Sequence, residues 1–292
     1  MTTTTQALVY INEPVLEFVD DPLINFQPNA NELIGGEGTL IAPDPNELIG
    51  GETEVVIPDL PEPVTYKPSP KEGPVDLYLN NDDNLGRDTY VVELVGGLGD
   101  DTLIGDGQTV VMDGGSGDDK LSGDGETVEM DGGSGGDTLI GNGNRVEMDG
   151  GSGDDTLIGN GKFVFIQGGL GDDTLFTNGK FVEMDGGSGN DFIVGGRGDD
   201  RIKGGTGIDM ITGGEGEDLF SLTKGDGYDT IIDFNDGEDK IIMHWEIIDD
   251  DLLITNVGRD AHIYNGDDLL AVVLNAAGTL ERQDDYTNTL LI

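Results

Sequence analysis

Residues 96–221 divide without a gap into fourteen units of nine residues. Nine units begin with the pattern Gly-Gly-x-Gly-x-Asp, and they start at Gly96, Gly114, Gly132, Gly150, Gly168, Gly186, Gly195, Gly204 and Gly213. The other five carry Val in place of that Asp, and they start at Gly105, Gly123, Gly141, Gly159 and Thr177. The two kinds alternate up to Gly186, so the period there is eighteen residues. Such strict periodicity predicts a repeat architecture in which each unit packs on its neighbours.

Each unit has a six-residue turn followed by three residues, of which the middle one is apolar. These apolar residues at position eight are Leu103, Met112, Leu121, Met130, Leu139, Met148, Leu157, Ile166, Leu175, Met184, Ile193, Ile202, Ile211 and Phe220. Three residues are too few for a free-standing strand, but they suffice when each strand stacks on the strand of the next coil. Two units then form one coil of turn, strand, turn and strand, with the apolar residues meeting in a thin core. Seven such coils at about 4.8 Å each predict a rod of roughly 34 Å.

The composition indicates that apolar burial alone does not hold this chain together. Hydrophobic residues make up 35% of the sequence and aromatic residues 6%, which is low for a close-packed core of 292 residues. The formal net charge of −46 disfavours nucleic acid and anionic membranes as partners. The sequence contains no apolar run of 18 residues, so it predicts no membrane-spanning helix. There is no Cys, so disulfides and thiol chemistry are excluded.

The regular turns supply the chemistry that such a chain needs. Glycine adopts positive φ freely and leaves the backbone carbonyl groups accessible, so several carbonyl oxygens can converge on a cation. The Asp at position six adds a carboxylate. Neutral and charged oxygen ligands together suit Ca²⁺, whereas Mg²⁺ prefers a tighter octahedron with retained water. Because His244 and His262 are the only histidines and Cys is lacking, the sequence argues against a zinc or iron site.

Nine Gly-Gly-x-Gly-x-Asp units in register resemble the nonapeptide repeat of the RTX family of secreted calcium-binding proteins, also called hemolysin-type. The resemblance implies a parallel β-roll in which Ca²⁺ lies between equivalent turns of successive coils. We therefore expect an all-β fold, namely a parallel β-roll solenoid with a C-terminal β cap and an extended, Pro-rich N-terminal segment. The expected ligand of each turn is the carboxylate at position six, together with backbone carbonyl groups.

Turns eighteen residues apart lie on the same edge of such a roll. One edge then carries the candidate ligands Asp101, Asp119, Asp137, Asp155, Asp173, Asp191 and Asp209, and seven turns leave six gaps. The opposite edge has Asp only at Asp200 and Asp218, which adds one gap and gives about seven ions in all. Its first five turns depart from the family pattern, and we predict that they are closed by apolar packing of Val110, Val128, Val146, Val164 and Val182. A degenerate turn at 225–231 places Asp229 in the ligand position.

The chain changes character on both sides of the repeats. All 11 prolines lie between Pro14 and Pro74, which predicts an acidic, extended or partly disordered segment at 1–75. This segment contains the heptapeptide NELIGGE twice, at Asn31–Glu37 and Asn46–Glu52, as a small binding repeat or a duplicated linker. We expect lead-in strands and the β-roll at 76–221, and a cap with antiparallel strands at 222–292. The acidic pair and apolar end of residues 284–292 resemble a type I secretion signal; the alternative is a final edge strand of the cap.

An outward apolar stripe is predicted on one strand face of the roll. Its members at position nine are Ile104, Ile140, Ile158, Phe176 and Val194, interrupted by Ser122. Such a stripe can pack on the N-terminal segment or on a partner, and the apolar patches of the N-terminal segment favour the first alternative.

No enzymatic function is indicated by the motifs. The sequence contains neither HExxH nor GxSxG, and paired carboxylates occur too widely to identify a catalytic pair. The first residues, Met-Thr-Thr-Thr-Thr, do not form a classical secretory signal. We expect a non-enzymatic protein of the cell surface or extracellular matrix, exported by a type I machinery, that folds on binding Ca²⁺. Its possible partners are a cell-surface polysaccharide or another matrix protein. The alternative is a hydrolase-like, adhesin or toxin-type protein with a site in residues 1–95 or 222–292.

Overall fold

The computed structural model describes residues 91–243 and 251–280, together with six short strands outside these two ranges. The strands are β1 (Thr39–Ile41), β2 (Glu54–Val56), β3 (Val64–Lys67), β4 (Asp76–Leu79), β5 (Val91–Leu98), β6 (Thr102–Ser116), β7 (Lys120–Ser134), β8 (Thr138–Ser152), β9 (Thr156–Leu170), β10 (Thr174–Thr177), β11 (Phe181–Ser188), β12 (Phe192–Arg197), β13 (Asp199–Thr206), β14 (Met210–Glu215), β15 (Leu219–Leu222), β16 (Asp229–Ile231), β17 (Lys240–Met243), β18 (Leu252–Val257), β19 (Asp260–Asn265), β20 (Asp268–Val273), β21 (Arg282–Gln283) and β22 (Leu290–Leu291). None of the described segments is a helix of the length and hydropathy that a bilayer crossing requires.

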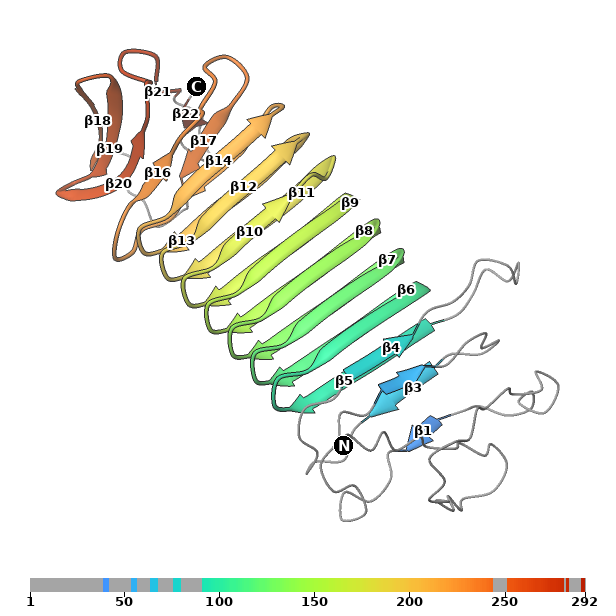
Figure 1. Cartoon of the computed structure of the whole chain (residues 1–292). Coiled ribbons are helices and arrows are strands. Elements are labelled where there is room, and N and C mark those ends of the chain that lie inside the picture. The colour runs from blue at the N-terminus through green and yellow to red at the C-terminus, as the bar shows by residue number, and fades with distance from the viewer. Residues whose placement is uncertain are drawn as a thin grey trace, which may run out of the picture.

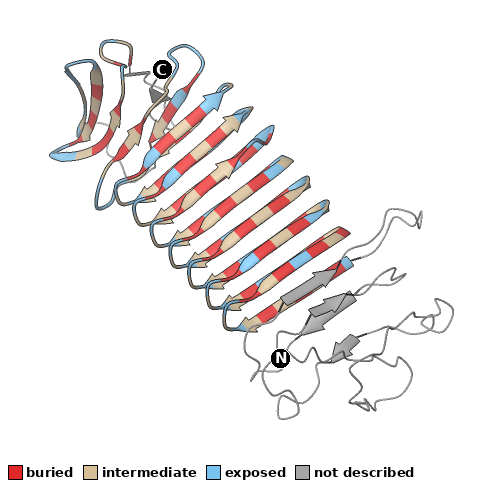
Figure 2. Cartoon of the chain, viewed as in Figure 1, coloured by how far each residue is buried: buried red, intermediate tan, exposed pale blue. Residues whose placement is uncertain are grey.

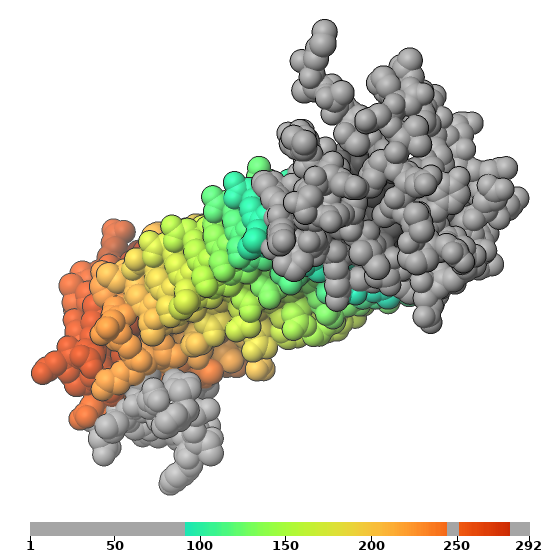
Figure 3. All heavy atoms as spheres, turned by 90° about the horizontal axis from the view of Figure 1, so that it is seen from below, coloured from blue at the N-terminus to red at the C-terminus, as the bar shows by residue number. Residues whose placement is uncertain are grey.

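The strands stack into two parallel ladders that wind around one axis (Figure 1). Residues eighteen apart pair throughout the repeats, as Leu103 does with Leu121 and Met112 with Met130. The first sheet contains β2, β4, the first halves of β6–β9, β10, β12, β14 and β16. The second sheet contains β1, β3, β5, the second halves of β6–β9, β11, β13, β15 and β17. This arrangement is the expected parallel β-roll, and Figure 3 shows the coils following one another along the rod.

The two kinds of turn differ in backbone conformation. In the Gly-Gly-x-Gly-x-Asp turns the second and fourth residues have positive φ, as at Gly115 (101°) and Gly117 (132°). In the described valine turns no residue has positive φ. The strands β6–β9 therefore run for 15 residues through the valine turns, whereas the chain leaves the ladder at each turn of the first kind. The prediction of separate three-residue strands is therefore wrong for β6–β9. The glycine pattern alone did not reveal that the valine turns keep an extended backbone.

The core is a single column of apolar side chains between the two sheets. Figure 2 shows how buried residues recur at regular intervals along the stacked strands. All fourteen residues at position eight are buried, and the most exposed of them, Met130, is 4% exposed. Along each strand buried and outward residues alternate, as expected for two sheets that each have one inner face. The predicted position-eight core is confirmed.

The N-terminal strands continue both ladders beyond the repeats. Strand β4 pairs with β6 in the first sheet, and β3 pairs with β5 in the second. Strands β1 and β2 begin eight residues after the first residue of the two NELIGGE copies, so each copy precedes one strand. The heptapeptides themselves lie outside the described residues.

The apolar stripe faces outward on the first sheet. Ile104 is 37% exposed, and Ile140, Ile158 and Val194 are half-buried. Phe176 makes an edge contact with Phe192, with ring centroids 5.7 Å apart. The described N-terminal strands lie in the ladders at the end of the rod rather than over this stripe (Figure 1). Because the other N-terminal residues lie outside the described part, their packing on the stripe stays a prediction.

The C-terminal cap contains the antiparallel strands that the sequence predicted. Strand β19 pairs antiparallel with β18 and β20, and β20 pairs parallel with β16, which extends the first sheet. Strand β22 pairs antiparallel with β17 at the end of the second sheet. Strand β22 also pairs antiparallel with β21, so Leu290 and Leu291 lie between two strands and do not form the edge strand that was the alternative. The other residues of 284–292 lie outside the described part, as does His244.

Candidate metal centre

The regular turns place their position-six aspartates in a buried row along one edge of the roll, which we call the aspartate edge. Each of these carboxylates is at most 2% exposed. The row consists of Asp101, Asp119, Asp137, Asp155, Asp173, Asp191 and Asp209. On the opposite edge, which we call the valine edge, Asp200 and Asp218 are buried in the same way. The structure thus brings nine of the ten predicted ligands into stacked turns.

One oxygen of most of these carboxylates has a structural role. The Oδ1 atom of Asp119 accepts a hydrogen bond from the backbone N–H of Asp101, one coil earlier, at 2.7 Å. The same bond recurs along the aspartate edge at 2.7–2.9 Å. On the valine edge Asp218 Oδ1 accepts from the N–H of Asp200 at 3.0 Å. The carboxylates therefore join successive coils before any ion is considered.

The other oxygen, Oδ2, is buried and has no hydrogen-bond partner. This holds for Asp119, Asp137, Asp155, Asp173, Asp191, Asp200, Asp209 and Asp218. A buried carboxylate oxygen without a partner costs free energy, and a cation bound to these oxygens would offset that cost.

Each Oδ2 atom borders a small space that only glycine leaves open. A Cβ atom on Gly114 would lie 2.5 Å from Asp119 Oδ2 and 2.6 Å from the carbonyl oxygen of Gly132 in the next coil. The same pair of oxygens, a carboxylate and the next coil's glycine carbonyl, faces the first glycine of seven turns: Gly96, Gly114, Gly132, Gly150, Gly168, Gly186 and Gly195. We call these spaces the seven cradles. Their number equals the number of gaps counted from the sequence, and their oxygen-only lining fits Ca²⁺.

Burial raises the pKa of these carboxyl groups, so they ionise less readily in the absence of a cation. Desolvation is the largest cause of the raised pKa, neighbouring carboxylates add to it, and the accepted backbone hydrogen bond opposes it at most of these positions. The pKa is raised to about 6 for Asp119 and Asp218, about 7 for Asp155, Asp173 and Asp191, and about 8 for Asp200. The pKa of Asp137 and of Asp209 is also raised, mainly by desolvation. Bound Ca²⁺ would neutralise the row and bridge successive coils.

The valine turns are closed by apolar packing, as predicted. Val110, Val128, Val146 and Val164 are fully buried, and Val182 is 4% exposed. A Cβ atom on Gly123 would lie 2.6 Å from the Cε atom of Met130 and 2.9 Å from Val128 Cγ1, so methyl groups occupy the space that a cradle has on the other edge. The first glycine of the other three Gly-initiated valine turns faces apolar side-chain atoms in the same way, where the cradles have a carboxylate and a carbonyl oxygen.

The C-terminal end of each row differs from the repeats. Asp229 is buried beside Asp209, and desolvation together with the neighbouring Asp209 carboxyl group raises its pKa. Asp229 thus lies next to the row, as predicted. The sequence analysis missed Asp239, whose Oδ1 accepts a hydrogen bond from the N–H of Asp218 at 3.0 Å. Asp239 lies 21 residues after Asp218, so the eighteen-residue period did not identify it.

A second row, at position five, also escaped the sequence analysis. Asp100 Oδ1 accepts a hydrogen bond from the N–H of Asp118 in the following coil at 3.0 Å, and Asp154 and Asp172 act likewise. These exposed side chains bond to the following coil, whereas the position-six carboxylates bond to the preceding one. The two rows together tie each turn to both neighbours.

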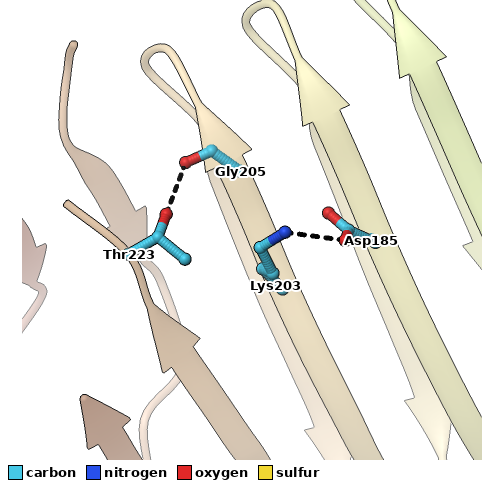
Figure 4. A network of polar contacts seen from close by, with 4 residues as sticks. All are labelled: Asp185, Lys203, Gly205 and Thr223. Atoms are coloured by element: carbon cyan, nitrogen blue, oxygen red, sulfur yellow. Dashed lines mark hydrogen bonds and ion pairs between the residues drawn. The ribbon is translucent and has the colours of Figure 1, made fainter. Parts of the chain in front are cut away.

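Other polar contacts lie near the aspartate edge on the second sheet and at its C-terminal end. Lys203 Nζ lies 2.7 Å from Asp185 Oδ2, and the hydroxyl of Thr223 donates to the carbonyl oxygen of Gly205 at 2.9 Å. Figure 4 shows both contacts. Among the described residues no three His, Asp or Glu side chains converge on a common point as metal ligands. A cation in the cradles must therefore take most of its ligands from backbone carbonyl groups.

The comparison with protein families agrees with this geometry. A family model described as the RTX calcium-binding nonapeptide repeat (four copies) matches residues 94–127, 131–161, 149–179, 185–220 and 194–231. A search of curated proteins finds no match to the chain. The matched segments include all seven cradles, and the repeat is a calcium-binding motif. Residues 94–231 of this chain are therefore an RTX calcium-binding β-roll.

Proposed function

We propose that this chain is a non-enzymatic, secreted protein whose roll folds when Ca²⁺ binds to the seven cradles. The observation that carries the proposal is the row of buried Oδ2 atoms without partners, most of which face a glycine carbonyl oxygen of the next coil. The proposed ligands are Asp101, Asp119, Asp137, Asp155, Asp173, Asp191, Asp200, Asp209, Asp218 and Asp229.

The energetics support coupling between binding and folding. Without a cation, folding would bury carboxylates at the spacing of successive coils, about 4.8 Å, where like charges repel by amounts of kcal/mol. The raised pKa values of Asp155 and Asp173 express the cost of burial first, through desolvation, and the repulsion between neighbouring carboxylates second. Relief of the repulsion makes the binding free energy part of the folding free energy.

The same coupling supports a role outside the cell. Extracellular calcium modules bind with dissociation constants of about 10⁻⁴–10⁻³ M, well above cytosolic Ca²⁺ concentrations. The roll would stay unfolded where Ca²⁺ is scarce, and a chain without cysteines could pass an export channel of the type I machinery in that state. It would fold outside, as a structural component of the cell surface or matrix, with a polysaccharide or another matrix protein as partner.

A far-UV circular dichroism titration of the full chain tests this proposal. We expect little strand signal in EDTA at pH 7.5, and a cooperative rise at millimolar Ca²⁺. Strand content that is already complete in EDTA would contradict calcium-driven folding.

A further inference from the structure

The valine edge changes the sign of its charge along the rod. Its first two turns, 105–110 and 123–128, contain Asp106, Asp124 and Glu126 and no basic residue. The next three turns contain Arg145, Lys162 and Lys180 and no acidic residue. In a chain with 14 basic residues against 60 acidic ones, three successive turns with only positive side chains stand apart from the rest of the surface.

Aromatic side chains lie beside these cations. Phe163 and Phe181 stack with ring centroids 5.4 Å apart and an interplanar angle of 16°. The two side chains are 36% and 42% exposed. At the equivalent positions the first two valine turns have threonine, namely Thr109 and Thr127. Exposed aromatic rings at successive coils are costly in water and point to a ligand that covers them.

The cations are positioned by the rings. Lys162 Nζ lies 4.9 Å from the ring centroid of Phe163, and Lys180 Nζ lies 5.5 Å from that of Phe181. Within the described part of the chain neither lysine forms an ion pair, whereas Arg145 contacts Glu147 at 2.6 Å. The two ammonium groups are therefore available to an anion. We call Arg145, Lys162, Phe163, Lys180 and Phe181 the basic-aromatic patch.

We propose that the basic-aromatic patch binds a carboxylated polysaccharide. The patch offers about one cation per coil, hence one per about 4.8 Å, which is comparable to the length of one pyranose residue. The stacked rings match the apolar C–H face of a sugar, and the ammonium groups match its carboxylates. Duplex DNA carries one charge per about 1.7 Å, a density that three cations do not match. An acidic peptide would be recognised by the cations and would leave the ring pair without a function.

This proposal rests on the proposed extracellular role in one respect, since that location is where the protein would encounter such a polysaccharide. The test measures binding of polygalacturonate to the calcium-loaded full chain by isothermal titration calorimetry in 150 mM salt. Polyglutamate, dextran and single-stranded DNA are the comparison ligands. Its outcome is separate from that of the EDTA titration, because the protein is folded in every measurement.

Two double variants use residues that the chain itself has at equivalent positions. Lys162→Gln with Lys180→Gln copies Gln108, and Phe163→Thr with Phe181→Thr copies Thr109 and Thr127. We expect each pair to weaken polygalacturonate binding by at least about tenfold. The matched controls are Lys120→Gln and Phe192→Thr on the first sheet, and Phe192 is as exposed as Phe163, at 36%. Both control variants should bind polygalacturonate as the original chain does. Circular dichroism and calcium stoichiometry confirm that each variant folds.

The outcomes separate the possible ligands. Binding of polygalacturonate well above polyglutamate and dextran, with loss in both double variants, supports the proposal. Equal binding of polyglutamate would overturn it in favour of an acidic protein partner, and tighter binding of DNA would overturn it in favour of nucleic acid. Binding that the phenylalanine pair does not affect would show bridging by Ca²⁺ or charge alone, and would also overturn it.

Discussion

At the scale of single residues, the position-six carboxylate has two separate functions. Its Oδ1 atom accepts the N–H of the preceding coil, and its Oδ2 atom lines a cradle with the next coil's glycine carbonyl. The side chain of the neighbouring residue at position five is exposed and accepts from the following coil. Adjacent aspartates in one turn thus differ in whether they can ligate a cation.

This difference predicts the effect of replacing Asp155. In Asp155→Asn the amide oxygen can still accept from Asp137, but the negative charge facing the cradle is lost. We expect one fewer bound Ca²⁺ by native mass spectrometry and a loss of stability of about 2 kcal/mol in calcium. Asp154→Asn is the matched control, because Asp154 is exposed and its oxygen continues to accept from Asp172. Equal ion counts in the two variants would show that Asp155 is not a ligand.

The raised pKa values predict opposite effects of pH with and without calcium. Asp173 and Asp191 have pKa values of about 7 in the metal-free fold, above the usual value near 4, so between pH 4 and 8 the folded state binds more protons than the unfolded state. In EDTA the free energy of unfolding should therefore increase as pH falls from 8 to 5. In saturating Ca²⁺ it should decrease, because protons compete with the ion for the carboxylates.

Far-UV circular dichroism at pH 5, 6, 7 and 8 measures this, as the strand signal in EDTA and as the melting temperature in saturating Ca²⁺. A strand signal in EDTA that does not increase as the pH falls, or a melting temperature in calcium that does not decrease, would contradict the assignment of these carboxylates as ligands.

At the scale of elements, the regular turn depends on glycine at two positions. Gly135 has a φ of 128°, and a Cβ atom there would overlap the carbonyl oxygen of Gly117. The next residue, Gly136, has ordinary φ, and its nearest atom, the carbonyl oxygen of Asp154, would lie 3.2 Å from a Cβ. We expect Gly135→Ala to cost at least about 2 kcal/mol of stability and Gly136→Ala to be nearly neutral. Chemical denaturation in calcium compares the two, and similar losses would refute this account of the turn.

The periodic features of these elements were predictable from the sequence. Position eight identified the core from Leu103 to Phe220 because a fixed period fixes which residues face inward. The replacement of Asp by Val predicted the apolar turns, because a valine side chain cannot ligate a cation. Two features were not predictable: the extended backbone of turns such as 123–128, and the hydrogen bonds of position-five residues such as Asp100. Both depend on backbone conformation, which the residue types alone do not specify.

The site was harder to predict where the period fails. Asp239 continues the row of the valine edge after 21 residues, and Asp229 continues that of the aspartate edge after a spacing of 20. Asp229 was found because a glycine turn precedes it, whereas Asp239 follows the segment 232–238, which has no repeat motif.

At the scale of the whole molecule, the roll has one edge that needs cations and another that is mostly closed by methyl groups. Because each of the seven cradles combines a carboxylate oxygen with a backbone carbonyl oxygen, the whole chain should distinguish Ca²⁺ from Mg²⁺, which prefers a tight octahedron and retained water. We expect millimolar Mg²⁺ to leave the strand signal in EDTA-treated protein almost unchanged. Folding at equal concentrations of the two ions would argue that charge screening alone drives the transition.

The most direct test of the central claim is a crystal structure grown in millimolar Ca²⁺, with anomalous scattering used to locate the ions. The account predicts six peaks between the turns from Gly96 to Gly204, one peak between the turns at Gly195 and Gly213, and none at the five valine turns. Empty cradles beside ordered carboxylates, or peaks at the valine turns, would contradict it.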